Sequence, residues 1–580
     1  MKSPVADIAL NPRGLLYDNS VAHRLAKALA RHGVTHIFGQ SLPSMVILAG
    51  EHYGIEQIAY RQENTGGYMA DGYARASGKV AVLTAQNGPA ATLLVAPLAE
   101  ALKASIPIVA LVQDVARDQT DRNAFQELDH ESMFRPVSKW VRRVTSAHRI
   151  EDYVDMAFVA AASGRAGPAV LLLPADLLTE SAPDQFKFVT DRKASLGRYP
   201  LDRMAPAQDK IRELAQMIAQ ASNPVVIAGG GLHASGACSE LAQLQQVAHL
   251  PVATTVMGKG SVDETHPLSI GVASYFMGRN GSTRHLGYLI AEADLIVLIG
   301  TRTNQNGTDS WKLYPKSARF VHIDIDPQEI GRNYEAIRLV GDAKLVLGEL
   351  LNALGSVDLT KRAQARLALE NKIKHGKAEF KAEASDLTSS DQAPIRPERV
   401  MSDLDALLTP DAMVVADASY SSIWVANYLT AQRAGMRFVT PRGLAGLGWG
   451  LPMALGVYFA NPGSPVFCVV GDGGFAHAWA ELETAVRKKA RIVLIVLNNG
   501  ILAYQKHAEN IKFGDHTNAC DFVPVDHTLI AKAVGANGIR VDQPDKLRDA
   551  IQTAVRFDGV TLIDVVTDPD AFPPVTWYEG

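Results

Sequence analysis

The residues best placed for chemistry in this sequence are an aspartate set among glycines and, further along, a pair of asparagines. Gly471-Asp472-Gly473-Gly474 follows the apolar run Val466–Val470, which favours a strand. A helix is predicted over Ala476–Lys489, and a second strand over Arg491–Leu497 leads into Asn498-Asn499. The two strands of such a βαβ unit lie parallel, so Asp472 and Asn499 are predicted to be neighbours at the carboxyl edge of a sheet.

This arrangement favours a diphosphate held through a divalent cation. Glycines let the backbone pass close to a phosphate, and the following helix points its N-terminal amides at the same anion. The Asp472 carboxylate, the Asn499 side-chain carbonyl and a backbone carbonyl just beyond, predicted to be that of Ile501, are hard oxygen ligands suited to Mg2+. The alternative is an ordinary glycine-rich turn with an unrelated asparagine pair. The agreement of strand, turn, helix and second strand argues against it.

The elements that must position these residues form an α/β fold. Apolar β-rich runs alternate with Ala-rich helical stretches in three successive parts of the chain, which predicts three α/β domains with parallel sheets. The predicted domains are residues 1–190, 200–355 and 396–580, and residues 356–395 are predicted to form a charged, exposed helix and a linker. Before the motif, the strand-like runs are Val80–Leu83, Ile106–Val112, Ala169–Leu173, Pro224–Ala228, Leu295–Ile299 and Phe320–Ile325.

Composition narrows the class of protein. The 580 residues carry a formal net charge of -4, without the basic excess of proteins that bind nucleic acid or membrane surfaces, so small molecules are the expected partners. Three scattered cysteines, no signal-peptide pattern and no long apolar span predict a soluble protein of the reducing cytoplasm.

The Gly-Asp-Gly turn and the Asn-Asn pair, at this spacing, resemble the signature of the thiamine diphosphate (ThDP) enzymes. The resemblance implies a pyrimidine-binding domain at 1–190, a central Rossmann-like domain at 200–355 and a diphosphate and Mg2+ domain at 396–580. ThDP and Mg2+ are then the expected cofactors, with Gly471, Asp472, Gly473, Gly474 and Asn499 in the binding site.

A second part of the resemblance lies near the N-terminus. Glu63, which precedes Ala70-Asp71-Gly72-Tyr73-Ala74-Arg75, matches the glutamate that hydrogen-bonds the cofactor's pyrimidine ring. Such an acid is needed because the thiazolium carbon must lose a proton near neutral pH. A glutamate that only complements a helix dipole is the alternative reading. In the family the two half-sites belong to different subunits, which implies a homodimer at minimum. A homotetramer is favoured, and the sequence leaves open whether a small regulatory subunit binds.

The glycine-rich bend at 443–450 is a third matching segment. Gly443 and Gly446 let backbone or ligand approach closely. Leu447 matches the bulky residue that holds the cofactor in its bent conformation, and a plain core role is the alternative.

Further segments resemble acetohydroxyacid (acetolactate) synthases. Phe125 and Gln126 match residues that line the cavity over the reactive carbon, and are predicted to contact substrate. The central domain resembles the FAD-contacting segments of these enzymes, with an ADP-type or vestigial site as the alternative. The residues implied for FAD are Gly229, Gly230, Gly231, Thr254, Met257, Gly258, Arg302, Asp324, Asp326 and Asp342.

Four segments depart from the synthase pattern. Those at 303–307 and 274–278 leave FAD uncertain, and Gln40-Ser41-Leu42-Pro43 and Leu502–His507 differ at the substrate cavity, which leaves the acceptor open. Lys506 and His507 are candidate ligands for a substrate carboxylate, and an ordinary surface pair on a helix is the alternative.

The predicted function is decarboxylation of a 2-oxo acid, with pyruvate favoured, and ligation of the acyl unit to a second carbonyl compound. The alternatives are a 2-oxo acid decarboxylase, a 2-hydroxyacyl-CoA or 2-hydroxyketone lyase, and a non-catalytic ThDP- or flavin-binding partner.

Overall fold

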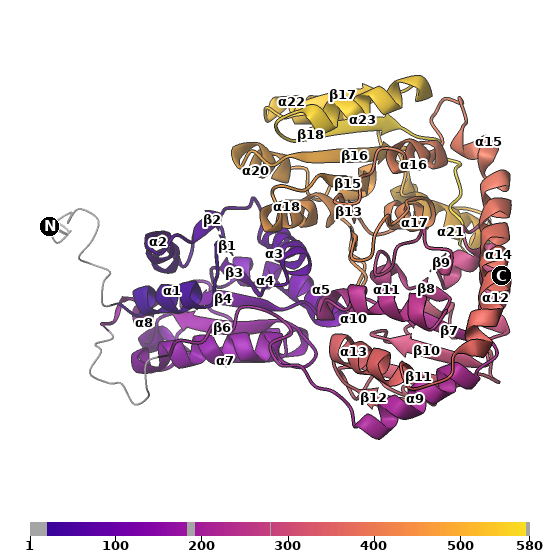
Figure 1. The fold of residues 1–580 in the computed structure, drawn as a ribbon. Helices are drawn as coiled ribbons and strands as arrows, with labels where there is room; N and C mark the ends of the chain where they lie inside the picture. Colours follow the sequence, from indigo (N-terminus) through magenta and orange to yellow (C-terminus); the bar gives the residue numbers. More distant parts are fainter. Residues whose placement is uncertain (1–19, 182–191, 279, 576–580) are drawn as a thin grey trace, which may run out of the picture. The chain divides into compact units, whose positions relative to one another are not determined.

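The computed structural model describes residues 20–181, 192–278 and 280–575. Parts of the predicted terminal domains, at 1–19, 182–190 and 576–580, therefore lie outside the described residues. The chain divides into two compact units. One contains residues up to Ala74 together with Lys79–Leu201, and the other contains Arg75–Gly78 and the chain from Asp202 onward. The first unit holds one six-stranded sheet and the second unit holds two (Figure 1).

The first sheet has the strand order β2-β1-β3-β4-β6-β5, and every neighbouring pair is parallel. Its strands are β1 (His36–Phe38), β2 (Glu56–Ile58), β3 (Ala81–Ala85), β4 (Ile108–Asp114), β5 (Trp140–Arg143) and β6 (Ala169–Pro174). Its helices are α1 (Val21–Arg31), α2 (Ser44–His52), α3 (Glu63–Ser77), α4 (Pro89–Leu93), α5 (Val95–Ala104), α6 (His130–Phe134), α7 (Ile150–Ala162) and α8 (Ala175–Thr179).

The inner strands of this sheet are apolar without alternation because helices cover both faces. Every residue of β3 and β6 is buried. Val109 and Leu111 of β4 share one hydrophobic cluster with Leu25 of α1 and Phe158 of α7. These helices therefore cover one face of the sheet and hold its strands in place.

The central sheet has the order β12-β11-β10-β7-β8-β9 and is also parallel throughout. Its strands are β7 (Pro224–Ala228), β8 (Val252–Thr254), β9 (Ser269–Val272), β10 (Leu295–Ile299), β11 (Arg319–Asp324) and β12 (Ile337–Val340). The helices of this part of the chain are α9 (Gln208–Gln220), α10 (Gly231–Ser235), α11 (Cys238–Val247), α12 (Gly287–Ala291), α13 (Ala343–Leu354), α14 (Thr360–Glu383) and α15 (Ser385–Thr388).

The third sheet has the order β14-β13-β15-β16-β18-β17, again with parallel neighbours. Numbered from its own first strand, this order is the same as that of the first sheet. Its strands are β13 (Met413–Ala416), β14 (Arg437–Val439), β15 (Val466–Gly471), β16 (Ile492–Asn498), β17 (Asn537–Val541) and β18 (Thr561–Val566). Its helices are α16 (Pro397–Asp405), α17 (Tyr420–Tyr428), α18 (Gly450–Ala460), α19 (Asp472–Phe475), α20 (Glu481–Arg487), α21 (Ala503–Phe513), α22 (His527–Ala533) and α23 (Leu547–Arg556).

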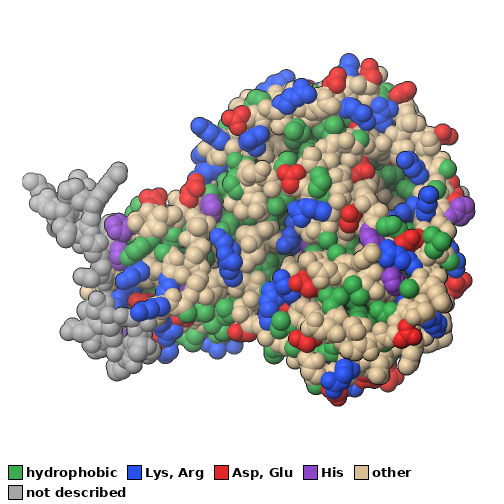
Figure 2. Space-filling view, in the orientation of Figure 1, with side chains coloured by type: hydrophobic (Ala, Val, Ile, Leu, Met, Phe, Trp, Pro, Cys, Tyr) green, Lys and Arg blue, Asp and Glu red, His purple; other side chains and the backbone are tan. Residues whose placement is uncertain are grey.

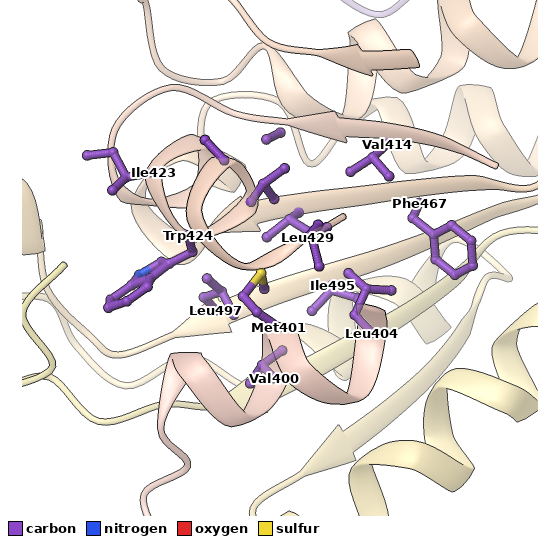
Figure 3. Close-up of a cluster of buried hydrophobic side chains, with 14 of the residues drawn as sticks. Val400, Met401, Leu404, Val414, Ile423, Trp424, Leu429, Phe467, Ile495 and Leu497 are labelled. Atoms are coloured by element: carbon purple, nitrogen blue, oxygen red, sulfur yellow. The ribbon is translucent and has the colours of Figure 1, made fainter. Parts of the chain in front are cut away.

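One face of the third sheet is covered by a large hydrophobic cluster. Phe467 of β15 and Ile495 of β16 pack in the same cluster as Leu404 of α16 and Trp424 of α17 (Figure 3). Apolar side chains thus fix one face of the sheet that carries the predicted diphosphate turn. Polar residues, among them Asp417 and Asp472, lie at the carboxyl ends of its strands.

The structure confirms the α/β prediction and corrects two of its details. The single helix predicted over Ala476–Lys489 is wrong: α19 ends at Phe475 and α20 begins at Glu481. The amides of His477 and Ala478 each bond the carbonyl three residues earlier, so tight turns replace α-helical bonding between the two helices. In addition β11 ends at Asp324, so Ile325 and Asp326 lie beyond the strand.

The surface agrees with the small net charge. Acidic and basic side chains are interspersed on the face shown in Figure 2. The charged segment after the central sheet forms α14, whose residues are mostly exposed. In the described ranges no helix has the length and apolar character needed to cross a membrane.

Candidate active site

The candidate diphosphate site lies where the order of the third sheet reverses. After β13 the chain adds β14 on one side and then returns to add β15 on the other side. Ligands of open α/β sheets bind at such a point, beyond the carboxyl ends of the strands. Asp417 follows β13 directly and Asp472 follows β15 directly, so the switch point is flanked by two carboxylates.

The Asp472 carboxylate is buried, and among the described residues its hydrogen-bond donors are backbone amides only. Its side-chain oxygens accept hydrogen bonds from the amides of Gly473, at 2.9 Å, and Gly500, at 2.8 Å. Burial raises the pKa of Asp472 to about 6, because two amide dipoles only partly offset the lost hydration. A cation beside this carboxylate would remove that penalty.

The structure separates the roles of the two asparagines. Asn498 is buried, and its side-chain amide donates to the Val525 carbonyl and to the Asp564 carboxylate, both at 2.9 Å. Asn499 is half-buried, and its side-chain oxygen accepts from the Ile501 amide at 3.2 Å. Because Gly500 bonds Asp472, Asn499 and Ile501 lie on either side of a residue that touches the candidate metal-binding carboxylate. The predicted proximity of Asp472 and Asn499 is therefore present.

Asp417 is a functional candidate that the sequence analysis missed. Its carboxylate is 1% exposed and accepts from the amides of Gly448 and Trp449, each at 3.0 Å. A Cβ added to Gly474 would lie 2.2 Å from Asp417 Oδ2. Asp417 thus ties the glycine-rich bend to the diphosphate turn. The signal available in the sequence was an acid directly after the apolar run Met413–Ala416, the same position that Asp472 has after β15.

The bend itself is irregular, as predicted. Gly448 has a φ of +85°, and a Cβ there would lie 2.5 Å from the Cβ of His477, so this position requires glycine. Gly446 packs against the indole of Trp449, with 2.9 Å between its ideal Cβ and Nε1. Leu447 is half-buried between these two glycines, and Gly443 is also half-buried.

These observations fit a cofactor held by a metal and a diphosphate. The oxygen set of Asp472, Asn499 and the Ile501 carbonyl contains one carboxylate only. Among the described residues, no three His, Cys, Asp or Glu side chains cluster in a way that could hold a metal. A ligand set with a single carboxylate does not require such a cluster. Gly473 has no room for a side chain, because a Cβ would lie 2.9 Å from Leu502 and Phe522.

Glu63 lies in the first unit, at the first residue of α3. Gly66 and Gly67 explain how this helix end is positioned: an added Cβ would lie 2.2 Å from the ring of Tyr60 at Gly66 and 2.4 Å from Pro97 at Gly67. The two glycines therefore let α3 approach Tyr60 and α5 closely. Tyr60 is itself fixed, because its hydroxyl donates to the Thr84 carbonyl at 2.8 Å.

Phe125 and Gln126 lie in the same unit as Glu63, on a loop before α6. Phe125 is 82% exposed. Gln126 has a φ of +62°, an uncommon conformation for a residue with a side chain. Its side-chain oxygen accepts from Gln86 Nε2 at 2.8 Å. The side-chain amide of Asn87 donates to the carbonyls of both loop residues.

Lys506 and His507 are both engaged within the fold. Lys506 Nζ lies 2.6 Å from the Asp521 carboxylate. The His507 ring bonds the Tyr420 hydroxyl at 3.0 Å and the Pro569 carbonyl at 3.1 Å. These contacts favour the structural alternative for the pair over a substrate-binding role.

In the central domain, the glycines of the resemblance pack against one another. A Cβ on Gly229 would lie 2.2 Å from the Gly300 carbonyl oxygen, and one on Gly258 would lie 2.0 Å from the Ala228 carbonyl oxygen. Gly231 donates its amide to Gly300, and Gly230 faces Met257. Close backbone packing at the ends of β7 and β10 thus accounts for these glycines without a ligand. Thr254 is fully buried at the end of β8.

The acidic residues of this domain divide into two groups. Burial raises the pKa of Asp324 to about 7, and its carboxylate accepts the Asp326 amide at 2.9 Å, with Arg302 as a charged neighbour. Asp342 instead caps α13, and its carboxylate is bonded to Arg203, Ser235 and the Leu345 amide. Asp324 therefore suits an added hydrogen-bond donor better than Asp342.

Three family models match the chain. Residues 19–133 match the N-terminal TPP binding domain of thiamine pyrophosphate enzymes, residues 211–350 match the central domain, and residues 417–565 match the C-terminal TPP binding domain. The last of these spans Asp417, Asp472 and Asn499.

Similarity to whole proteins gives the same result. The chain is 32% identical to the probable acetolactate synthase large subunit of Methanococcus aeolicus, over 95% of the chain and 92% of that protein. It is also 32% identical to the acetolactate synthase of Arthrospira platensis, over 96% of the chain and 95% of that protein. The chain therefore belongs to the thiamine pyrophosphate enzyme family. It is a thiamine diphosphate-dependent enzyme of the acetolactate synthase type.

Proposed function

We propose that this enzyme decarboxylates a 2-oxo acid, pyruvate being the first to test, and ligates the acyl unit to a second carbonyl compound. The observation that carries the proposal is that the residues proposed for both half-sites are present in a chain related to acetolactate synthases along nearly its whole length. Glu63 begins α3, and Asp472 lies beside Asn499 at the switch point of the third sheet.

In this proposal the diphosphate half-site holds the cofactor through Mg2+. Asp472, Asn499 and the Ile501 carbonyl would hold the metal, and Gly471, Gly473 and Gly474 would leave room for the phosphates. The bend at Gly443, Gly446 and Leu447 would support the centre of the cofactor. When bound, thiamine diphosphate supplies an electron sink for cleavage of the bond to the substrate carboxylate.

Glu63 is the proposed acid beside the pyrimidine. Its carboxyl group would hold a proton beside the pyrimidine and would supply the acid that activation of the bound cofactor requires. Phe125 and Gln126 are proposed to line the substrate cavity. Glu63 also argues against a non-catalytic binding partner, because binding alone needs no activating acid.

The test is the Glu63→Gln variant. Glutamine retains the size and can still hydrogen-bond the ring, but it cannot carry the proton, so ThDP binding should persist while turnover of pyruvate falls by at least about 100-fold. Binding is measured by calorimetry with Mg2+, and turnover by CO2 release. Glu51→Gln, an exposed glutamate of α2, is the matched control. Unchanged turnover in Glu63→Gln would reject the mechanism.

A simple decarboxylase or lyase remains the second candidate, since the segments at 40–43 and 502–507 depart from the synthase pattern. Product analysis with pyruvate separates the two functions. Acetolactate supports the carboligase, and acetaldehyde without acetolactate supports the decarboxylase.

We also propose FAD as a ligand of the central domain. Support comes from the half-buried Asp324 at the end of β11, whose pKa is raised to about 7 by desolvation, and from Arg302 nearby. Thr254, Met257, Asp326 and the glycines 229–231 and 258 complete the set implied by the resemblance. Flavin absorbance of the purified, heat-released ligand tests this assignment, and an adenine nucleotide without flavin would indicate the ADP-type alternative.

The remaining parts of the proposal concern the whole protein. The proposed domains are residues 1–190, 200–355 and 396–580, joined by 356–395. We further propose a homodimer at minimum, with a homotetramer and a small regulatory subunit open to test by light scattering and copurification. A cytoplasmic location fits Cys238, Cys468 and Cys520, all free in the structure.

A further inference from the structure

A fully buried histidine lies beneath the loop that carries Phe125 and Gln126. His130 is the first residue of α6, and its side chain is 0% exposed. The Gly88 amide donates to His130 Nε2 at 2.9 Å. On the other side of the ring, Nδ1 lies 3.2 Å from Asp114 Oδ1, at the end of β4. The imidazole therefore joins two strand ends of the first sheet.

These contacts determine where the imidazole carries its hydrogen. A backbone amide can only donate, so Nε2 must be unprotonated, and the ring hydrogen is on Nδ1, where it donates to Asp114. Asp114 is held in turn, because Oδ1 accepts the Val115 amide at 2.9 Å and Oδ2 lies 3.2 Å from Arg143 Nε. Asp114 thus selects the tautomer that lets His130 accept from Gly88.

Gly88 connects this histidine to the substrate-facing loop. Its φ is +64°, and a Cβ at this position would lie 2.6 Å from the Cβ of Gln126, so the turn and the loop are in direct contact. The two residues before Gly88 bond the same loop. Gln86 donates to the Gln126 side chain at 2.8 Å, and Asn87 donates to the Gln126 carbonyl at 3.1 Å. Every polar link to Gln126 in this set comes from the turn whose amide His130 binds.

We propose that His130 is a positioning residue for Phe125 and Gln126, with Asp114 fixing its tautomer. The inference rests on the proposed function only in assigning those two residues to the substrate cavity. His130 does not touch substrate. It keeps the turn at 86–88 in place, and that turn holds Gln126 in its unusual backbone conformation.

Two substitutions of His130 distinguish a side chain that positions the Gly88 turn by hydrogen bonding from one that only fills space in the core. The side-chain amide of His130→Gln extends to about the place of Nε2 and can accept from Gly88. The shorter amide of His130→Asn corresponds to Nδ1, so it can bond Asp114 but leaves the Gly88 amide unpaired. We expect His130→Asn to raise KM for the 2-oxo acid about 10-fold, and His130→Gln to stay within about 3-fold of the unchanged protein.

A second readout does not depend on activity. Hydrogen exchange followed by mass spectrometry should show faster exchange in peptides covering 86–94 and 121–128 of His130→Asn, but not of His130→Gln. Affinity for ThDP and Mg2+ should be the same in all three proteins, because the metal-binding carboxylate lies in the other unit.

Each outcome decides the question. Equal KM and equal exchange in all three proteins would overturn the proposal, and so would equal losses in both variants with a matching fall in Tm, since that pattern indicates a space-filling role. If the unchanged protein turns over no 2-oxo acid, the proposed function fails. The exchange data still support or reject the link from His130 to Gln126.

Discussion

Asp417 and Asp472 end neighbouring strands of one sheet, yet their surroundings give them different tasks. Asp417 is enclosed by the amides of the bend and by Gly474, which leaves its oxygens no space for a metal. Asp472 bonds two amides that lie on the chain segments around the switch point. Asp472 is therefore the metal-binding candidate, and Asp417 holds the two loops together.

The Asp472→Asn variant should bind ThDP in the presence of Mg2+ at least about 100-fold more weakly, because an amide lacks the charge that the cation needs. Calorimetry with stripped protein, ThDP and Mg2+ measures the loss. Asp515→Asn is the control, since that carboxylate is 91% exposed beyond α21. Equal affinity in the Asp472 variant would remove this residue from the metal site.

The Gly474→Ala variant should weaken ThDP binding and lower Tm, because the new methyl group would lie 2.2 Å from Asp417 Oδ2. We expect a loss of stability of about 1–3 kcal/mol. Gly463→Ala is the matched substitution, since a Cβ there meets nothing within 4 Å. Thermal unfolding with and without cofactor measures the Tm of both variants. Similar Tm values would show that the backbone at Gly474 can shift to make room for the methyl group.

At this scale the sequence predicts residues that form a compact motif. Asp472 and Asn499 could be found because strand, turn and second strand are contiguous and their geometry is local. Asp417 and His130 were missed for different reasons. Asp417 follows an apolar run just as Asp472 does, but it lacks the flanking glycines that mark a phosphate turn. His130 stands in no recognisable motif, and only the fold brings it to the Gly88 amide.

Among the elements, α1 and α7 are joined by an ionic network around the buried carboxylate of Asp155 in α7. Burial alone would raise the pKa of the Asp155 carboxyl. Hydrogen bonds from His32, Arg31 and Arg192 outweigh burial and hold this pKa well below its usual range. The network therefore stabilises the packing of the two helices that cover one face of the first sheet.

The Asp155→Asn variant should lose about 1–3 kcal/mol of stability near pH 7, since it removes the buried carboxylate to which Arg31, His32 and Arg192 are bonded. The folded-state pKa is lower than the unfolded value of about 3.9, so the unfolded chain binds more protons in acid. The stabilisation is thus fully present above the unfolded pKa and is lost as pH falls through the folded pKa.

Urea unfolding of both proteins at several pH values measures this difference. The gap between them should be widest near neutral pH and should narrow toward pH 3. Asp152→Asn is the control, because that carboxylate binds the same Arg192 but is 30% exposed, against 9% for Asp155, and pairs near the surface contribute about 1 kcal/mol or less. A constant gap at all pH values would contradict the ionic explanation.

Element types followed from sequence more reliably than element ends. Continuous apolar runs identified β15 and β16, and the charged stretch identified α14, because burial and exposure determine these patterns. The break between α19 and α20 was missed, since Ala476–Ala480 has ordinary helix-forming residues and the tight turns there depend on packing near Asp417 and His477.

On the scale of the whole molecule, Glu63 belongs to one compact unit and Asp472 to the other. The family resemblance implies that a complete site takes Glu63 from one chain and Asp472 from its mate. Complementation between inactive variants tests that arrangement directly.

Coexpressed Glu63→Gln and Asp472→Asn chains should recover about a quarter of full activity, because half of the randomly formed dimers are mixed and each mixed dimer has one intact site of two. Each variant expressed alone should be inactive. Turnover of the purified mixture gives the answer. No recovery, with mixed dimers verified by two affinity tags, would place both half-sites in the same chain.

The uniformly parallel sheets affect how the chain folds. No two neighbouring strands in the described sheets form a hairpin, so each pairing must wait for a crossover to close. Such non-local contacts form late, and apolar strands such as β4 and β16 stay open to association meanwhile. Refolding from denaturant should therefore be slow, and its yield should fall as the protein concentration rises. Recombinant production should benefit from low temperature and added chaperones.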